Sequence, residues 1–387
     1  MLEEFQLLIK PTSSDCNQRC TYCFYSRVGR SLHPETASHR MSAETLEGMI
    51  RRFLRMRMQR SVFCWQGGEP TLMGLDFYRH AVGLMQAHGA GGQSVTNALQ
   101  TNGLLIDAEW SRFLTQYHFL VGLSLDGPED LHDHYRGRGT YQQVMRAMQV
   151  MRENHTEFNV LAVVNDQTAR HARRIYTHFR ELGMMHMQFI PCVETGPDGR
   201  PAPFSVSPEA YGDFLCELFD AWLPEARQCV SERLFDALLS REITGRTGLC
   251  NLDHGCGQYL VVEYNGDVYP CDFFVQPEWR LGNILTMPVE KLLARGRARE
   301  FRGLRAKRPA ACAECRWSDL CQGGCLKDRG RVGEYDRPTF FCKAFQRFFP
   351  HAEGPIRQIA DEWRAAHPQE AEQFDNTKAQ RHKETAD

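Results

Sequence analysis

The first half of the chain alternates short apolar runs with longer segments of helical period, and this alternation restricts the fold more than any other feature. The apolar runs predict strands at residues 5–10, 61–65, 94–100, 118–125, 158–164 and 185–191. Between them, helices are predicted at residues 42–58, 75–88, 107–117, 140–154 and 167–182, with Ser42 and Asp107 as their clearest N-caps. Strands separated by helices need right-handed crossovers, so the pattern predicts a parallel sheet in an α/β fold. Ligands of such sheets bind at the carboxyl ends of the strands.

The second half of the chain is organised differently. A Gly- and Pro-rich stretch at residues 194–210 breaks the alternation, and helical segments follow near 208–224 and 230–242. Two alternating runs flank Asn265-Gly266 in "YLVVEYNGDVYPC", which predicts a β-hairpin. We expect an α/β domain over residues 1–193, a helical linker region over 194–249, a cysteine-rich domain over 250–350 and a C-terminal helix or frayed tail over 351–387.

Bulk composition excludes several classes of protein. The chain has 387 residues, of which 42% are hydrophobic, so it can bury a sizeable core. Its formal net charge of −2 gives no reason to expect nucleic acid or a membrane surface as a partner. The opening "MLEEFQLLIK" lacks the positive-then-apolar pattern of an export signal, and no apolar run is long enough to span a bilayer. We expect a cytoplasmic protein.

Fifteen cysteines indicate metal chemistry, because eleven of them stand at tight spacings. Three lie within "DCNQRCTYCFY", directly after the first predicted strand: Cys16, Cys20 and Cys23. Eight more occupy the cysteine-rich region: Cys250, Cys256, Cys271, Cys312, Cys315, Cys321, Cys325 and Cys342. In a long chain without an export signal, such clusters favour metal or iron–sulfur ligation over disulfides. The isolated cysteines are expected to be reduced core residues: Cys64, Cys192, Cys216 and Cys229.

The spacing of these cysteines leaves two kinds of metal site open. Three thiolates can hold a [4Fe–4S] cluster and leave one iron available to a small molecule. A zinc site that takes a fourth ligand from a distant His or Cys is the alternative. The eight later cysteines suffice for two fully ligated [4Fe–4S] clusters or for two four-cysteine zinc sites.

The first cysteine loop and the segments that end the predicted strands together resemble the radical S-adenosylmethionine (SAM) enzymes. "CNQRCTYCFY" resembles their CxxxCxxC loop, and "QGGEP" (66–70) resembles their GGEP motif. "QTNG" (100–103), "SLDGP" (124–128) and "VVN" (163–165) close the next three strands in order. The resemblance implies a partial (β/α)6 radical SAM barrel. It also implies that SAM chelates the open iron and yields a 5′-deoxyadenosyl radical after one-electron reduction.

The same resemblance implies a set of SAM-binding residues. Glu69 is expected to receive the methionine ammonium, and Gly67 and Gly68 to let the backbone approach the ligand. Contacts to the ribose or carboxylate are expected from Ser124 and Asp126, for which a strand-ending turn is the structural alternative. The predicted cofactor-binding set is completed by Tyr22 and Asn165.

The later cysteines resemble the SPASM extension of peptide-modifying radical SAM enzymes, with spacing very close to the anaerobic sulfatase-maturating enzymes. By position, one auxiliary cluster would use Cys250, Cys256, Cys271 and Cys325, and the other Cys312, Cys315, Cys321 and Cys342. Full ligation favours electron relay over substrate binding. The resemblance therefore implies a radical SAM barrel followed by a SPASM domain that binds two iron–sulfur clusters. With the SAM-binding cluster, the chain would hold three [4Fe–4S] clusters.

One acidic residue stands out in this region, because Asp272 directly follows Cys271. In the maturating enzymes an aspartate at this position is proposed as the catalytic base, whereas an ordinary turn aspartate is the structural alternative. Tyr25 and Gln66 match positions near the substrate. The resemblance implies oxidation of a Cys or Ser residue in a sulfatase polypeptide to Cα-formylglycine. The expected partners are that polypeptide, unfolded or extended, and a low-potential electron donor such as flavodoxin or ferredoxin.

Two other functions remain open at this point. One is a SPASM-type maturase of another peptide or protein, which would form thioether or carbon–carbon crosslinks. Such maturases often carry an N-terminal precursor-recognition domain, and only fifteen residues precede Cys16 here, which counts against this alternative. The other is a non-catalytic zinc protein built on four-cysteine sites.

Overall fold

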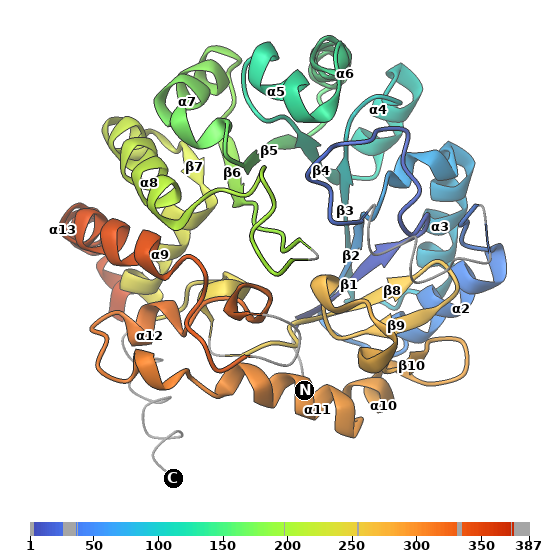
Figure 1. The fold of residues 1–387 in the computed structure, drawn as a ribbon. Helices are drawn as coiled ribbons and strands as arrows, with labels where there is room; N and C mark the ends of the chain where they lie inside the picture. Colours follow the sequence, from blue (N-terminus) through green and yellow to red (C-terminus); the bar gives the residue numbers. More distant parts are fainter. Residues whose placement is uncertain are drawn as a thin grey trace. The chain divides into compact units, whose positions relative to one another are not determined.

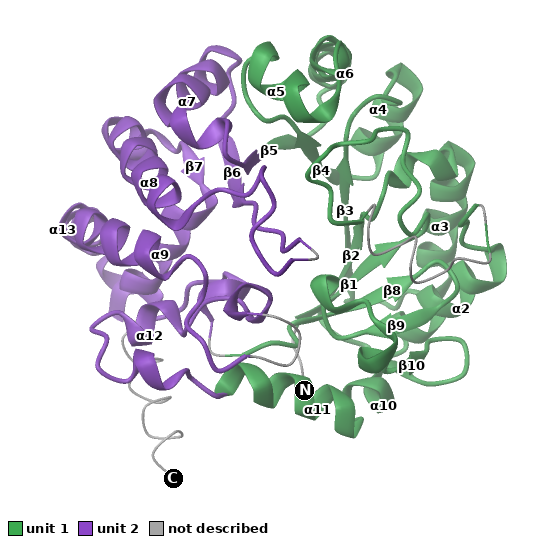
Figure 2. Cartoon of the chain, viewed as in Figure 1, with its two compact units in different colours: residues 1–161, 255–306 green, residues 162–254, 307–387 purple. Residues whose placement is uncertain are grey.

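The computed structural model describes residues 4–25, 36, 38–196, 198–253, 255–330, 335–372 and 374. The chain divides into two compact units, drawn in different colours in Figure 2. Unit 1 comprises residues 1–161 and 255–306, and unit 2 comprises residues 162–254 and 307–387. Each unit is therefore assembled from two separate stretches of the chain.

Unit 1 is built on a mostly parallel sheet (Figure 1). Its strands are β1 (Glu4–Lys10), β2 (Arg60–Trp65), β3 (Ser94–Thr101), β4 (Phe119–Ser124), β5 (Phe158–Val164), β8 (Tyr259–Glu263), β9 (Asp267–Tyr269) and β10 (Gly282–Asn283). They lie in the order β10-β9-β8-β1-β2-β3-β4-β5, and β5 ends in unit 2. Neighbouring strands from β1 to β5 pair in parallel, which confirms the prediction from the alternating pattern.

The helices of unit 1 are α2 (Ala43–Leu54), α3 (Leu75–His88), α4 (Ala108–Gln116), α5 (Glu129–Arg136), α6 (Thr140–Glu153), α10 (Val289–Leu293) and α11 (Gly296–Ala306). Four of them, α2, α3, α4 and α6, lie at the predicted places, whereas α10 and α11 were not predicted. The Ser42 side chain accepts from the Thr45 N–H, and Asp107 caps α4 in the same way, so both predicted N-caps are confirmed. The first helix ends earlier than predicted, because Arg57 adopts a left-handed φ of 53°. Helix α5 was not predicted.

The predicted hairpin at Asn265-Gly266 is confirmed, since β8 pairs antiparallel with β9. Gly266 occupies the turn with a φ of 83°, which glycine adopts without strain. Strand β8 also pairs in parallel with β1, so that Glu263 lies opposite Lys10. The sequence did not predict this second pairing, which extends the sheet of unit 1 with residues from late in the chain.

Unit 2 is mainly helical. Its helices are α7 (Ala172–Glu181), α8 (Pro208–Trp222), α9 (Arg233–Thr244), α12 (Ser318–Cys321) and α13 (Cys342–Ala366), and β6 (His186–Pro191) pairs in parallel with β7 (Ser231–Glu232). Phe219 of α8, Phe235 of α9 and Phe348 of α13 form its aromatic centre, with ring centroids 5.1–5.9 Å apart. Burial of each such ring stabilises the fold by about 1.5–3 kcal/mol.

The isolated cysteines do not all lie in the core. Cys192 is buried, and Cys64 and Cys216 are partly buried. Cys229 is exposed at the left-handed end of a 3-10 turn, so its prediction as a core cysteine was wrong. Within the described ranges, no helix combines the length and apolar character needed to cross a bilayer.

Candidate active site

The loop after β1 carries the first three clustered cysteines and lies directly on the GGEP segment after β2. The backbone N–H groups of Gly68 and Glu69 donate to the carbonyl oxygens of Ser13 and Asp15, each at 2.8 Å. Gly67 has a φ of 118°, and a Cβ at Gly68 would stand 2.1 Å from the Asp15 carbonyl oxygen. The two glycines therefore allow close approach of these backbones. Their contact with SAM stays a prediction.

Two further segments hold this loop in place. The Asn102 side chain, at the end of β3, donates from Nδ2 to Asn17 Oδ1 at 2.7 Å and lies 3.8 Å from Cys16 Sγ. The Thr21 N–H donates to the Tyr135 carbonyl oxygen at 3.0 Å. Asn102 was not among the predicted site residues, although "QTNG" was recognised as a strand end.

The three thiols of this loop influence one another. Burial raises the pKa of the Cys16 thiol to about 12, and the nearby charges of Glu69, Cys20 and Cys23 act in the same direction. Three neighbouring thiolates need positive charge beside them, which the irons of a cluster supply. In the part of the chain that the structure describes, no group of three or more His, Cys, Asp or Glu side chains could hold a single metal ion. That finding concerns one-ion sites, whereas a [4Fe–4S] cluster binds each cysteine through a different iron. The loop thus fits a cluster, and the ligand assignment stays a prediction.

Glu69 is buried at 1% exposure and already has several donors. Its Oε1 accepts from the Thr71 N–H at 3.0 Å and from Thr101 Oγ1 at 2.8 Å, and its Oε2 accepts from the Asn102 N–H at 2.8 Å. Burial raises the pKa of Glu69 in spite of these hydrogen bonds. A carboxylate oxygen has two lone pairs, so Oε2 retains acceptor capacity for a further donor.

Asp126 lies in a buried ion pair at the end of β4. Arg136 donates to both carboxylate oxygens at 2.8 and 3.1 Å, and the Tyr22 hydroxyl donates to Oδ2 at 2.5 Å. Burial raises the pKa of Asp126, but the charge and hydrogen bonds of Arg136 outweigh it, and the net shift is downward. The structure therefore brings together two of the predicted cofactor-binding residues, Tyr22 and Asp126, around an arginine that the sequence analysis did not identify.

Ser124 and Asn165 differ in how many of their side-chain hydrogen-bonding groups have a partner within the protein. Ser124 is partly buried, and its Oγ accepts from Gln100 Nε2 at 3.1 Å. Asn165 is buried, and its Oδ1 accepts from the N–H groups of Gln167 and Thr168, both at 2.9 Å. Its Nδ2 has no partner among the described residues. That amide group is available to donate to a bound molecule.

The Asp272 carboxylate lies among the side chains of two predicted residues, Tyr25 and Gln66, and of Lys10, which was not predicted. Lys10 Nζ lies 2.7 Å from Asp272 Oδ1 and 3.8 Å from Glu263 Oε1, with the lysine only 2% exposed. The Tyr25 hydroxyl donates to Asp272 Oδ2, and Gln66 Nε2 does so at 3.5 Å. The structure thus brings Tyr25, Gln66 and Asp272 together at the carboxyl ends of β1 and β2.

Lys10 was missed because it ends an apolar run and was counted as part of a strand. Its Nζ also lies 4.3 Å from the centroid of the Tyr25 ring, within the range of a cation–π interaction. Phe24 packs between Tyr25 and Phe273, with ring centroids at 4.0 and 5.0 Å. These rings form an apolar wall beside the Asp272 carboxylate.

In unit 2, three of the later cysteines influence one another. Burial raises the pKa of Cys342, and the thiolates of Cys312 and Cys315 raise it further. These three belong to one predicted cluster set, and their mutual influence fits that grouping. The place of Cys321 in the set stays a prediction.

The segment between Cys321 and Cys325 is a tight left-handed turn. Gln322, Gly323 and Gly324 have φ values of 53°, 73° and 74°. Arg329 is buried at 1% exposure and donates to the carbonyl oxygens of Gln322 and Gly323 at 2.6 and 3.0 Å. The spacing Cys-x3-Cys is thereby fixed by a turn that two glycines permit.

The other predicted set is divided along the chain. Cys256 and Cys271 belong to unit 1, where Cys271 Sγ lies 3.4 Å from the Tyr259 hydroxyl. Cys250 and Cys325 belong to unit 2. Their assignment to one cluster stays a prediction.

Comparison with known proteins gives a consistent picture. Residues 11–178 match the radical SAM superfamily, and residues 250–316 match the SPASM iron–sulfur cluster-binding domain. A cysteine-type anaerobic sulfatase-maturating enzyme of Clostridium perfringens is 38% identical over 363 residues, covering 92% of this chain and 98% of that enzyme. A serine-type anaerobic sulfatase-maturating enzyme of Bacteroides thetaiotaomicron is 34% identical over 368 residues, covering 89% of this chain and 88% of that enzyme. The solved structure of native anSMEcpe with bound AdoMet and Kp18Cys peptide has a TM-score of 0.87 at 38% identity, covering 93% of this chain and 99% of that chain.

Proposed function

The chain belongs to the anaerobic sulfatase-maturating enzymes, radical SAM enzymes with a SPASM domain, and on this premise we propose that it oxidises a Cys or Ser residue of a sulfatase polypeptide to Cα-formylglycine. The fold class agrees with this membership, since a parallel α/β sheet precedes a cysteine-rich SPASM region. The observation that carries the proposal is the meeting of Asp272 with Lys10, Tyr25 and Gln66. A carboxylate placed there, at the strand ends next to the cysteine loop, is suited to remove a proton from a substrate.

Asp272 acts as the general base for the substrate thiol or hydroxyl. SAM, when bound, would supply the radical chemistry that takes a hydrogen atom from the substrate Cβ. Lys10 stabilises the negative charge of the carboxylate, and the Tyr25 hydroxyl and Gln66 amide fix its orientation. Removal of the proton leaves a negative heteroatom on the substrate, which favours loss of the next electron, and the auxiliary clusters would accept that electron. A serine then gives the aldehyde directly, whereas a cysteine gives a thioaldehyde that water hydrolyses.

The SAM site is assigned to residues with remaining hydrogen-bonding capacity. Cys16, Cys20 and Cys23 would hold a [4Fe–4S] cluster and leave one iron for SAM. The spare acceptor capacity of Glu69 Oε2 supports its contact with the methionine ammonium, and the unpartnered Asn165 Nδ2 supports donation to an oxygen of the cofactor. Ser124 remains a candidate for the ribose. Asp126 and Tyr22 would act indirectly, because both groups already bind each other or Arg136.

The eight later cysteines would hold two further [4Fe–4S] clusters, so the chain would carry three. Their sets are Cys250, Cys256, Cys271 and Cys325, and Cys312, Cys315, Cys321 and Cys342. Full ligation by cysteine leaves no iron for the substrate, which supports a role in electron transfer. The expected electron donor is a low-potential carrier such as flavodoxin or ferredoxin.

The substrate is proposed to bind as an extended segment, since a folded sulfatase would hide the reacting residue. Unit 2 contains a cavity of about 550 Å³, lined in part by Val193, Thr195 and Pro201. A cavity of this size can hold several residues of an extended chain. The proposal gives part of the contact with the substrate to the stretch at residues 194–210, of which Thr195, Gly199 and Pro201 line this cavity.

The proposal is tested by anaerobic reconstitution with iron, sulfide and SAM, followed by incubation with two sulfatase peptides that differ only in Ser or Cys. At least one peptide is expected to give an aldehyde, read by mass spectrometry and hydrazide labelling, together with 5′-deoxyadenosine. The variant Asp272→Asn should keep its iron and part of its SAM cleavage but lose aldehyde formation by about 10²–10⁴-fold, as for removal of a general base.

The matched control is Asp267→Asn, because Asp267 lies in β9, shortly before Asp272 in the chain, and its carboxylate pairs with Arg280. It should form product at the wild-type rate. Full product yield from Asp272→Asn would reject the base assignment. A peptide product with a thioether or carbon–carbon crosslink and no aldehyde would replace the proposed function with the alternative maturase.

A further inference from the structure

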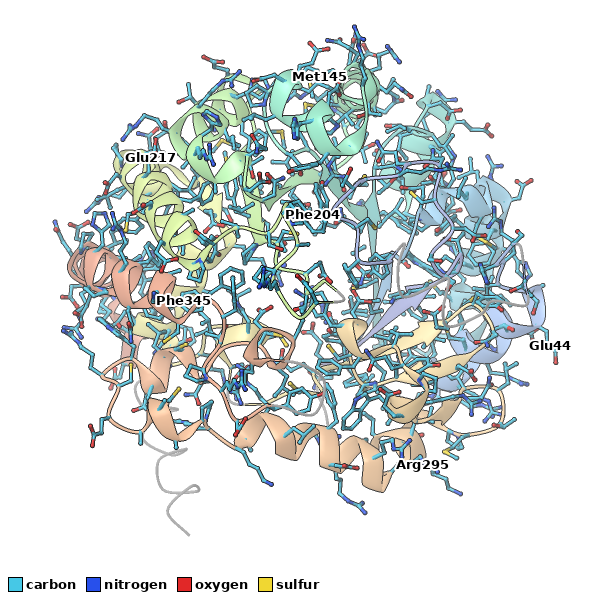
Figure 3. The ribbon with its side chains drawn as sticks, in the orientation of Figure 1. Glu44, Met145, Phe204, Glu217, Arg295 and Phe345 are labelled. Carbon is cyan, nitrogen blue, oxygen red and sulfur yellow. The ribbon has the colours of Figure 1, made fainter. Side chains whose placement is uncertain are left out.

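Helix α11 carries a concentration of positive charge that the proposed reaction does not use. The whole chain has 46 Lys and Arg against 48 Asp and Glu, so its charge is nearly balanced. At the start of α11, however, Arg295, Arg297 and Arg299 are all exposed, and the first turn contains no acidic residue. Figure 3 shows Arg295 on the outside of the ribbon in this region. Arg297 lies in the first turn of α11, where the helix dipole favours negative charge. Glu300 is the one acidic residue of this helix.

The arginines at the start of α11 also differ from several arginines in unit 2 that form ion pairs. Arg227, Arg316 and Arg364 each pair with a carboxylate at 2.7–2.8 Å. By contrast, Arg299 and Arg302 donate to the backbone carbonyl oxygens of Ala294 and Leu293. Across the described residues, no carboxylate pairs with Arg295, Arg297 or Arg299. Their charge is thus available to a partner.

The opposite side of α11 contacts residues next to two of the proposed cluster ligands. The side chain of Arg302 lies over Gly257, which follows Cys256, so that a Cβ at Gly257 would stand 2.9 Å from Arg302 Cδ. The Phe301 ring packs against Phe274, three residues after Cys271, at 5.0 Å between centroids. One short helix therefore connects exposed positive charge with the segments that carry Cys256 and Cys271.

A second run of arginines in unit 1 does not share these properties. Arg51 and Arg52 lie in the last turn of α2, where the helix dipole favours positive charge. Arg55 and Arg57 follow in the connection to β2, at the amino-terminal edge of the sheet. The cysteine loop lies at the opposite edge, after the carboxyl end of β1. This run therefore serves as a matched control.

We propose that the arginines at the start of α11 form the docking surface for an acidic one-electron carrier protein, which exchanges electrons with the cluster held in part by Cys256 and Cys271. In the reducing direction the carrier loses one electron and the metal centre of this protein gains it; in the oxidising direction the electron returns to the oxidised carrier. No bond forms or breaks in this step. The inference rests on the proposed function, because it takes these two cysteines as cluster ligands. Opposite charge steers such partners together and makes their association depend on salt.

The test uses the reconstituted holoenzyme and a purified acidic flavodoxin. Its first readout is the dissociation constant of the complex at several salt concentrations. A triple variant replaces the three arginines: Arg295→Gln, Arg297→Gln and Arg299→Gln. Its dissociation constant for flavodoxin should rise by about tenfold at low salt and should depend less on the salt concentration. The control Arg51→Gln, Arg55→Gln, Arg57→Gln removes the same charge from the same unit and should bind as the wild type does. Charge reversal by Arg295→Glu with Arg297→Glu should weaken binding further.

The second readout separates this inference from the proposed function. Product formation driven by dithionite-reduced methyl viologen, a small cation that needs no docking surface, should be unchanged in the α11 variant, whereas formation driven by flavodoxin should fall. Unchanged flavodoxin affinity, equal loss in the α2 control, or equal loss with both reductants would overturn the docking surface. A raised KM for the peptide with unchanged flavodoxin affinity would overturn it too, because the arginines would then bind substrate. Absence of aldehyde from the wild type with any reductant would instead reject the proposed function.

Discussion

At the residue scale, the Asp272 carboxylate depends on a lysine that comes from the far end of the chain. A lysine at 2% exposure needs a negative partner to offset its desolvation, and Lys10 has one at 2.7 Å and a second carboxylate at 3.8 Å. This ion pair holds the Asp272 carboxylate beside the Tyr25 hydroxyl and the Gln66 amide. We therefore regard Lys10 as a positioning residue for the proposed base.

The variant Lys10→Met should keep its iron and SAM cleavage but lose aldehyde formation by about 10–100-fold, because Asp272 loses its charged neighbour. Lys10→Arg should restore much of the activity by restoring the charge. Equal losses of aldehyde formation in Lys10→Arg and Lys10→Met would show that Lys10 has only a structural role.

Of the residues around the proposed base, the sequence predicted those beside a family motif and did not predict Lys10. Asp272, Tyr25 and Gln66 each adjoin a recognisable motif, so their positions could be carried over from the family. Lys10 adjoins a motif too, but a lysine at the end of a strand normally reaches solvent, and only its partner from the hairpin segment explains its burial. Interactions between residues far apart in the chain leave no periodic signal in either segment.

At the element scale, local patterns predicted the strands, the parallel sheet of the first half and the late hairpin, but not where that hairpin joins the sheet. The six predicted strands and the hairpin at Asn265-Gly266 are present, because period and turn residues are local properties. The parallel pairing of β8 with β1 was not predicted, since it depends on which apolar edge a late hairpin covers. A C-terminal helix or frayed tail was expected over residues 351–387, but α13 begins earlier, at Cys342, and continues through Pro350 and Pro355, which normally interrupt helices.

The start of α9 gives a pH-dependent prediction. Glu232 caps this helix, accepting from the N–H groups of Leu234 and Phe235 at 2.8 and 3.0 Å. Burial raises the pKa of Glu232 to about 8, above the value of about 4.3 in an unfolded chain. Between these values the folded state binds more protons than the unfolded state, so this residue lowers stability as pH rises through that window.

The variant Glu232→Gln keeps a capping oxygen and removes the ionisable group. It should be more stable than the wild type at pH 8, by on the order of 2 kcal/mol, and should lose this advantage near pH 4. Thermal melts of both proteins across this range measure the difference. Parallel melting curves at every pH would contradict the assignment of a raised pKa to this carboxyl.

At the scale of the whole molecule, the clustered cysteines form two groups. Three lie in one loop of unit 1, and the eight later cysteines are distributed over both units. The replacement of Cys16, Cys20 and Cys23 together by alanine should therefore remove one cluster and leave the others. Iron should fall from about twelve to about eight atoms per chain, and SAM cleavage should be abolished. Iron analysis and chromatography of 5′-deoxyadenosine measure the two effects. An iron content equal to that of the wild type would contradict the count of three clusters.

The interleaving of the two units has a consequence for biosynthesis. Strand β1 ends at Lys10, but its neighbour β8 ends only at Glu263. At about 5–20 residues per second, the growing chain waits roughly 15–50 s before that edge can be covered. During this interval the edge of β1 that does not pair with β2 and three thiols stand open to oxidants and to other nascent chains. Chaperones and the iron–sulfur delivery machinery would therefore have to act on a half-made protein.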